Sequence, residues 1–166
     1  MKHSLRTLVI GLAVAGTTVT GIGLTATSAS SAPSTATLVA IRAGHHTGYD
    51  RFVLEFSGPV PSRSITWVSQ VIQDGSGKPV RLAGHAFLNV RLANSVAHDG
   101  AGHATAPGRQ TFALPNLTQY ALAGDFEGVV NVGLGYQRKE TVHVSTLSSP
   151  SRLVIDVSTP YSTTPA

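Results

Sequence analysis

Histidine and aspartate side chains that could bind a metal ion occur in two short stretches of the sequence. His45 and His46 begin the stretch H-H-T-G-Y-D-R-F-V-L-E-F, and His98, Asp99 and His103 lie in a second, polar stretch. Imidazole and carboxylate groups are common protein ligands of zinc and related transition metals. Whether either stretch can bind a metal depends on the elements that hold these side chains.

The first stretch leads into an apolar run that is typical of a β-strand. Adjacent residues of a strand point to opposite faces of the sheet, so His45 and His46 would seldom ligate one ion from regular structure. Asp50 follows Gly48 and Tyr49 at an expected turn, where its carboxylate can accept hydrogen bonds from nearby backbone N–H groups. These residues are better interpreted as the polar start of a strand than as a metal site.

The second stretch belongs to a long polar segment, residues 93–108. Segments of this length without regular structure are often functional or disordered. Here His98 and His103 could hold a transition metal together with Asp99, but solvated loop histidines are the simpler interpretation. We therefore expect no metal and no cofactor.

Two carboxylates, Asp125 and Glu127, stand two residues apart in G-D-F-E-G and would share one face of a strand. Glycoside hydrolysis uses such a pair, with the two groups about 5–9.5 Å apart around a cleft. A hydrolase would also need a histidine to converge with them in a pocket. The sequence contains no serine-hydrolase motif or other sign of a cleft, so we interpret the pair as a turn before a strand at Val129 and expect no enzyme.

Apolar residues alternate with polar residues or glycine along much of the chain, which is the pattern of half-buried β-strands. The sequence D-G-S-G-K-P, residues 74–79, predicts a hairpin-type turn, and residues 117–123, ended by Gly124, are the single helix candidate. The pattern therefore predicts an all-β fold, an antiparallel sandwich or barrel with at most one short helix. Strands are expected at residues 37–42, 52–56, 65–72, 86–92, 130–136, 142–145 and 153–157.

The segments R-F-V-L-E-F and R-L-V-I-D-V share one template: an arginine, three apolar residues, an acid and one apolar residue. Antiparallel pairing in matched register places each arginine opposite the acid of the other strand, whereas parallel pairing sets arginine beside arginine. We therefore predict a structural ladder of ion pairs, each contributing about 0.2–1 kcal/mol. Its members are Arg51 opposite Asp156 and Glu55 opposite Arg152.

The first 32 residues have the three regions of a secretory signal peptide. Lys2 and Arg6 precede the apolar run L-V-I-G-L-A-V-A-G, and small and hydroxylated residues follow it. We expect cleavage within about residues 26–32, with an uncleaved anchor as the alternative. The mature protein would then be secreted by the general route without a membrane anchor, as one domain with a disordered tail at residues 159–166.

The composition excludes several classes of function. The chain contains no cysteine, which removes disulfides, thiol catalysis and a lipid-bearing cysteine. Without Lys2 and Arg6 the basic count falls from 12 to 10 against 8 acidic residues, so the net charge is +2. The basic residues are scattered along the chain, so nucleic acid is not expected as a partner.

Five segments, taken in their order, carry a family resemblance: G-Y-D-R-F-V-L-E-F, the D-G-S-G turn, G-H-A-F-L-N-V-R-L, G-D-F-E-G-V and P-S-R-L-V-I-D-V. Over about residues 37–158 the chain resembles the AMIN-like domain of secreted actinobacterial proteins. This family looks related to the AMIN domain of cell-envelope amidases and secretins. The resemblance implies a β-sandwich that binds peptidoglycan or another envelope component. Many AMIN-like proteins are lipoproteins, and this cysteine-free chain departs from them.

The resemblance implies a secreted, non-catalytic binding module at the cell wall, which we expect to be a monomer. Its partner would be a wall glycan such as peptidoglycan, or an envelope protein. A protein-interaction module that pairs an exposed strand edge with its partner is the alternative. The candidates for binding are Trp67 and Tyr136, which could stack on sugar faces unless they are buried, and Arg42, Arg63 and Arg91, which could meet an anionic wall polymer.

Overall fold

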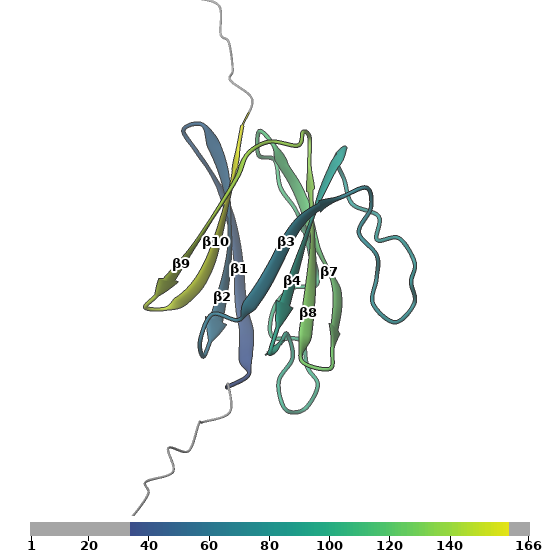
Figure 1. Ribbon diagram of the computed structural model, residues 1–166, viewed down its shortest axis with the longest axis vertical. Coiled ribbons are helices and arrows are strands. Elements are labelled where there is room, and N and C mark those ends of the chain that lie inside the picture. The colour runs from purple at the N-terminus through teal and green to yellow at the C-terminus, as the bar shows by residue number, and fades with distance from the viewer. Residues whose placement is uncertain (1–33, 160–166) are drawn as a thin grey trace, which may run out of the picture. The chain divides into compact units, whose positions relative to one another are not determined.

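The computed structural model describes residues 34–159, so the expected signal peptide and residues 160–166 of the expected tail lie outside the described residues. The described residues form ten strands and no helix, arranged as two five-stranded sheets (Figure 1). Accordingly, residues 34–159 contain no helix long and apolar enough to span a membrane. The expected all-β, mostly antiparallel sandwich is confirmed.

The strands divide between the sheets in the following spatial order. Sheet A contains β5 (Ser95–Val96), β1 (Ala36–His46), β2 (Tyr49–Ser57), β10 (Ser151–Ser158) and β9 (Val142–Ser148). Sheet B contains β3 (Ser62–Val68), β4 (Ala86–Ala93), β8 (Val129–Tyr136), β7 (Leu117–Phe126) and β6 (Arg109–Thr111).

The hydrophobic core lies between the two sheets because the long strands each turn one apolar face inward. In β2 the buried residues are every second one, and in β4 the inward positions are likewise apolar. Tyr120 of β7 is fully buried in this core, and its hydroxyl donates a 2.7 Å hydrogen bond to the carbonyl oxygen of Pro107. The period-two pattern of the sequence therefore identified the core faces of both sheets.

The helix expected at residues 117–123 is wrong, because this segment is the first part of β7. It pairs with β8 on one side and with β6 on the other. The pairing register with β8 shifts between Leu117 and Gln119 and again between Leu122 and Gly124. Such bulges break the two-residue period, so the apolar residues of β7 imitate the spacing of a short helix.

The connection between β3 and β4, seen at the right of Figure 1, lies against the outer face of β8. Two glycines of β8 make this approach possible. A Cβ at Gly133 would collide with the side chain of Val71, and a Cβ at Gly135 would collide with the carbonyl oxygen of Ala83. The glycines that alternate with apolar residues in β8 therefore mark a segment packed on the sheet.

β2 and β10 pair antiparallel in the register expected from their charges, with Arg51 opposite Asp156. The guanidinium of Arg51 donates two hydrogen bonds of 2.8 Å to the Asp156 carboxylate. These hydrogen bonds raise the pKa of Arg51 above its ordinary value. This bidentate pair links the second strand of the domain to its last.

The second expected pair of the ladder does not form, although Glu55 and Arg152 lie opposite each other. Glu55 instead forms an ion pair with Arg42 of β1, the other strand next to β2. The Nε of Arg152 instead lies 3.4 Å from the carbonyl oxygen of Pro150. Each residue of a strand in the middle of a sheet has neighbours on both adjacent strands. The shared sequence template indicated only the neighbour on β10.

Candidate functional site

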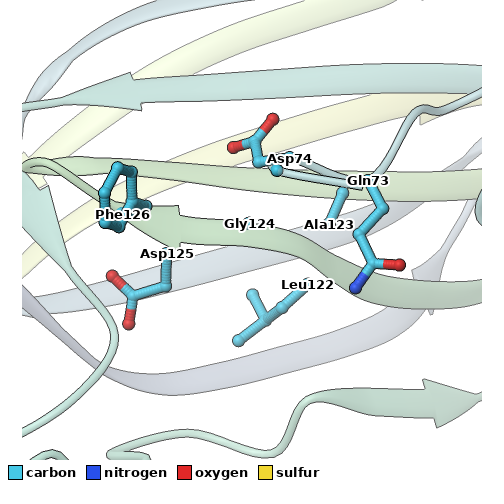
Figure 2. A pocket seen from close by; sticks show the side chains of 8 residues that line it. Gln73, Asp74, Leu122, Ala123, Gly124, Asp125 and Phe126 are labelled. Atoms are coloured by element: carbon cyan, nitrogen blue, oxygen red, sulfur yellow. The ribbon is translucent and has the colours of Figure 1, made fainter. Parts of the chain in front are cut away.

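A pocket of about 420 Å³ opens where the turn after Ile72 meets the C-terminal half of β7 (Figure 2). Its wall consists of residues 73–75 from the turn and residues 122–126 from β7. The pocket therefore combines the D-G-S-G turn with the G-D-F-E-G segment, which are far apart in the sequence.

Asp74 fixes the turn against β7. Its N–H donates a 2.8 Å hydrogen bond to the carbonyl oxygen of Ala123, and its Oδ2 accepts a 2.6 Å hydrogen bond from Nδ2 of Asn131. The carboxylate lies directly over Gly124, where any side chain would collide with it. Asp74 is consequently held as a hydrogen-bond acceptor at the rim of the pocket.

Asp125 supplies a second carboxylate to the pocket wall. Its Oδ2 accepts a 3.0 Å hydrogen bond from the N–H of Ala97 and lies 2.6 Å from Nδ1 of His98. Its Oδ1 is buried and has no hydrogen-bond partner among the described residues. Because this oxygen is buried, it is out of reach of a ligand, and the Asp125 carboxylate serves to fix Ala97 and His98 against β7.

Phe126 gives the pocket an aromatic face. The side chain is 69% exposed, whereas the other large apolar residues in the described part of the chain are at most 45% exposed. It is the last residue of β7 and precedes a two-residue hairpin turn, in which Glu127 and Gly128 have φ angles of 50° and 72°. Positive φ at both positions is the type I′ geometry that suits such a hairpin, and the turn leaves the ring in solvent.

The residues that line the pocket are suited to binding rather than to hydrolysis. An aromatic face can stack on the C–H face of a sugar, while the Asp74 carboxylate and the Gln73 side chain can bond its hydroxyl groups. A hydrolase would need Asp125 and Glu127 on one face of a strand, and this alternative is wrong. β7 ends at Phe126, and Glu127 lies in the turn, outside the pocket wall. The turn interpretation of this segment is confirmed.

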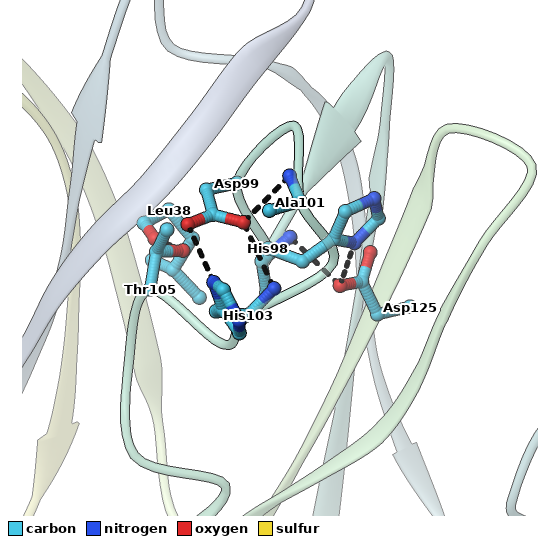
Figure 3. A network of polar contacts seen from close by, with 8 residues as sticks. Leu38, His98, Asp99, Ala101, His103, Thr105 and Asp125 are labelled. Carbon is cyan, nitrogen blue, oxygen red and sulfur yellow. Dashed lines mark hydrogen bonds and ion pairs between the residues drawn. The ribbon is translucent and has the colours of Figure 1, made fainter.

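The polar segment at residues 93–108 contains β5 and an ordered turn (Figure 3). Oδ1 of Asp99 accepts hydrogen bonds of 2.9 Å from the N–H groups of Ala101 and His103. These bonds, chiefly the one from His103, lower the pKa of Asp99 below its ordinary value. The hydroxyl of Thr105 donates a 2.6 Å hydrogen bond to the carbonyl oxygen of Leu38, which ties the segment to β1.

The histidines contact single carboxylates. His98 lies beside Asp125, and Nδ1 of His103 lies 3.2 Å from Oδ2 of Asp99 (Figure 3). Within residues 34–159 no three histidine, aspartate or glutamate side chains are grouped so that they could hold a metal ion. The polar segment therefore holds the Asp125 carboxylate in place through His98 and Ala97, and in this way it supports the pocket wall.

Asp50 contacts the opposite sheet, so the local turn contacts expected for it are wrong. The carboxylate is fully buried because Asp50 shares the inward face of β2 with Phe52. Its Oδ2 accepts hydrogen bonds of 2.6 and 2.8 Å from the N–H groups of Asn116 and Leu117, and its Oδ1 lies 2.8 Å from Nδ1 of His45. Asp50 thus joins the first hairpin to the start of β7.

The aromatic residues expected to stack on sugars lie elsewhere. Tyr136 is fully buried, and burial raises the pKa of its hydroxyl, so it offers no face to a ligand and that prediction is wrong. Trp67 is half-buried and packs against the Tyr136 ring with centroids 5.5 Å apart. The alternating apolar patterns around Trp67 and Tyr136 indicated core packing for both. Phe126 was not predicted as a binding residue because its exposure depends on the turn that follows it.

The three arginine candidates have different surroundings. Arg42 pairs with Glu55 on the outer face of sheet A. Arg63 of β3 and Arg91 of β4 line one hollow of about 190 Å³ together with Ser62, Ser64 and Ala93. The register sets Arg63 opposite Leu92 and Arg91 opposite Ser64, so the two arginine side chains leave opposite faces of sheet B.

A β-sandwich with an exposed aromatic ring and hydrogen-bond acceptors in a surface pocket has the features of a ligand-binding module. The family model of the AMIN-like domain matches residues 36–159, and the chain belongs to this family. AMIN-like domains are cell-envelope-related, non-catalytic modules. Neither the curated proteins nor the solved structures contained a significant match to the chain.

Proposed function

We propose that the protein is a secreted module that binds peptidoglycan, and that the pocket at Phe126 holds one of its sugar units. The observation that carries the proposal is the 69% exposed ring of Phe126 in a pocket that is also lined by Asp74 and Asp125. The membership of the AMIN-like family supports an envelope ligand.

The expected affinity of a single pocket is low. Covering one face of a phenyl ring contributes roughly 1–2 kcal/mol, and each hydrogen bond to a charged acceptor contributes about 1.5–3 kcal/mol. After the cost of ordering the ligand, dissociation constants of about 0.1–1 mM are expected for one sugar unit. Retention on an insoluble polymer is therefore a better test than binding of a monosaccharide.

Phe126→Ala should reduce retention of the mature protein on insoluble peptidoglycan at least about fivefold, since the ring contact is lost. Because this contact is apolar, retention of the wild-type protein should survive salt between about 0.05 and 0.5 M. The measurement is a pull-down that determines the bound fraction against the amount of polymer. The matched control is Leu147→Ala, which removes an apolar side chain that is 45% exposed on β9. Equal retention of the Phe126→Ala and wild-type proteins would overturn the proposal.

A protein-interaction module is the second candidate, and the edge of sheet A favours it. In the described residues β9 pairs only with β10, and Val144 and Leu147 of β9 are 39% and 45% exposed. A hollow of about 550 Å³ next to them is lined by residues 59–60, 146–148 and 151. Edge strands are usually short or protected, as β5 and β6 are, and a long free edge can accept a partner strand. In the same pull-down, absence of retention of the wild-type protein would favour this candidate.

A further inference from the structure

We infer that the ligand of the pocket carries a protonated primary amine, and that the Asp74 carboxylate binds this ammonium group beside the ring of Phe126. The inference rests on the proposed function and deepens it, because it specifies the charge and a chemical group of the ligand in the same pocket. It follows from the register of β7, from the contacts of Asp74 and from the charges around the pocket.

The Asp74 carboxylate and the Phe126 ring lie on the same face of β7, the outer face of sheet B. Between Gly124 and Phe126 the register with β8 is regular, so these two residues point to one side of the strand. Asp125 between them is opposite Val130, a core residue, and points to the other side. Figure 2 shows the same division, with Asp74 and Phe126 on one side of the β7 ribbon and Asp125 on the other.

The carboxylate and the ring are close enough to contact one small cation. A Cβ at Gly124 would collide with Oδ2 of Asp74, so the carboxylate lies where the missing side chain of Gly124 would begin. The side chain of Phe126 begins two residues further along the strand, which is about 7 Å away. An ammonium group about 2.8 Å from a carboxylate oxygen can therefore also lie within about 6 Å of the ring centroid, the range of a cation–π contact.

The Asp74 carboxylate is fixed in position and still has acceptor capacity. Its Oδ2 accepts a hydrogen bond from Asn131, and the N–H of Asp74 ties the turn to Ala123. Its Oδ1 makes no hydrogen bond, and Asp74 forms no ion pair, with a residue in the range 34–159. Asp74 is exposed, so a ligand can reach it. A carboxylate only accepts hydrogen bonds and an ammonium group only donates them, so the two are matched.

The charges around the pocket favour a cation over a neutral or anionic group. Among the described residues no lysine or arginine lines the pocket, and Glu127 in the turn after β7 adds a negative charge close by. Arg91 on β4 is separated from β7 by β8, and Lys78 belongs to the same turn as Asp74, but neither forms an ion pair with Asp74 in the structure of residues 34–159. An ammonium group beside the ring therefore gains a charge attraction that a hydroxyl group does not.

Two parts of peptidoglycan can supply a primary ammonium group. One is a sugar unit from which the N-acetyl group has been removed, and the other is the side chain of a diamino acid in an uncrosslinked stem peptide. A pocket of about 420 Å³ has room for either group. The chemistry at Asp74 is the same in both cases, so the two sources are separated by the choice of ligands in the test.

The test measures the ratio of two affinities by calorimetric titration at low salt, at a pH that keeps amines protonated. One ligand pair is an N-acetylglucosamine oligosaccharide and the same oligosaccharide with one N-acetyl group removed, and the other is a disaccharide with a stem peptide whose side-chain amine is acetylated or free. In at least one pair the wild-type protein should bind the amine form about tenfold more tightly. Asp74→Asn keeps an acceptor for Asn131 and should bring this ratio close to one. The control, Glu127→Gln, removes the same charge outside the pocket wall and should change the ratio less than about twofold.

The outcomes separate this inference from the proposed function. Measurable but equal affinities within both ligand pairs, or a preference for the amine that survives in the Asp74→Asn variant, would overturn the ammonium site and leave the sugar pocket intact. If none of the four ligands binds, the sugar pocket and the ammonium site both fail. A preference that depends on Asp74 only in the oligosaccharide pair assigns the amine to the sugar, and one that depends on Asp74 only in the peptide pair assigns it to the stem peptide.

Discussion

Replacing Asp50 with alanine should lower the free energy of unfolding by about 3–5 kcal/mol. Its carboxylate is 0% exposed and accepts hydrogen bonds from the backbone N–H groups of Asn116 and Leu117. Alanine would leave both donors without a partner in the interior, since water reaches neither residue. Urea-induced unfolding, followed by tryptophan fluorescence, measures the change.

Asp99→Ala is the matched control for this prediction. Asp99 also accepts two backbone N–H groups, from Ala101 and His103, but both donors lie on exposed residues and can bond water after the substitution. We expect a loss of less than about 1 kcal/mol for this variant. Similar losses for Asp50→Ala and Asp99→Ala would contradict the role of Asp50 as the buried link between the sheets.

Gly135→Ala should lower the free energy of unfolding by about 3 kcal/mol. A Cβ at this position of β8 would collide with the carbonyl oxygen of Ala83 and approach the hydroxyl of Thr118 to 3.2 Å. The first contact is backbone, so it cannot be relieved by a side-chain rotation, and the connection between β3 and β4 must move off the sheet. Urea-induced unfolding measures this loss as well.

Gly44→Ala is the control for the close approach at Gly135. Gly44 also lies in a strand, β1, but a Cβ there meets no atom within 4 Å. We expect this variant to be as stable as the wild type or more stable by up to about 1 kcal/mol, because alanine restricts the unfolded chain. If the Gly135→Ala variant has the same free energy of unfolding as the wild type, the connection between β3 and β4 packs less closely than the structure indicates.

The strands and the register of β2 with β10 could be predicted from the sequence because both depend on local pattern. Alternation identifies the inward face of a strand wherever pairing is regular, as in β2 and β4. The matched charges of Arg51 and Asp156 fix one register for their strands. The partner of Glu55 could not be predicted, because nothing in the template indicates which strand lies on the other side of β2.

The start of β7 could not be recognised as a strand because its bulges break the alternation. At residues 117–123 the local spacing favoured a helix, and the hydrogen bonds of β7 to β6 and β8 decide its conformation instead. Long-range pairing of this kind leaves little trace in a short segment.

The candidate site could be predicted only in its parts. The D-G-S-G turn and the G-D-F-E-G segment each carry visible turn chemistry, but their meeting depends on the contact of Asp74 with Gly124 and Asn131. The exposure of Phe126 depends on the type I′ turn at Glu127 and Gly128. The aromatic residues that the sequence offered for stacking, Trp67 and Tyr136, occupy apolar positions of regular strands and pack against each other.

The most direct test of the sugar pocket is a titration of the ¹⁵N-labelled protein with a neutral N-acetylglucosamine oligosaccharide, followed by amide chemical shifts. If the pocket at Phe126 binds the sugar, the largest shifts will occur at residues 73–75 and 122–126, and they will be lost in the Phe126→Ala variant. Shifts confined to β9, or no shifts at a ligand concentration of about 10 mM, would contradict the account, because a site with a dissociation constant of about 0.1–1 mM would then be nearly saturated.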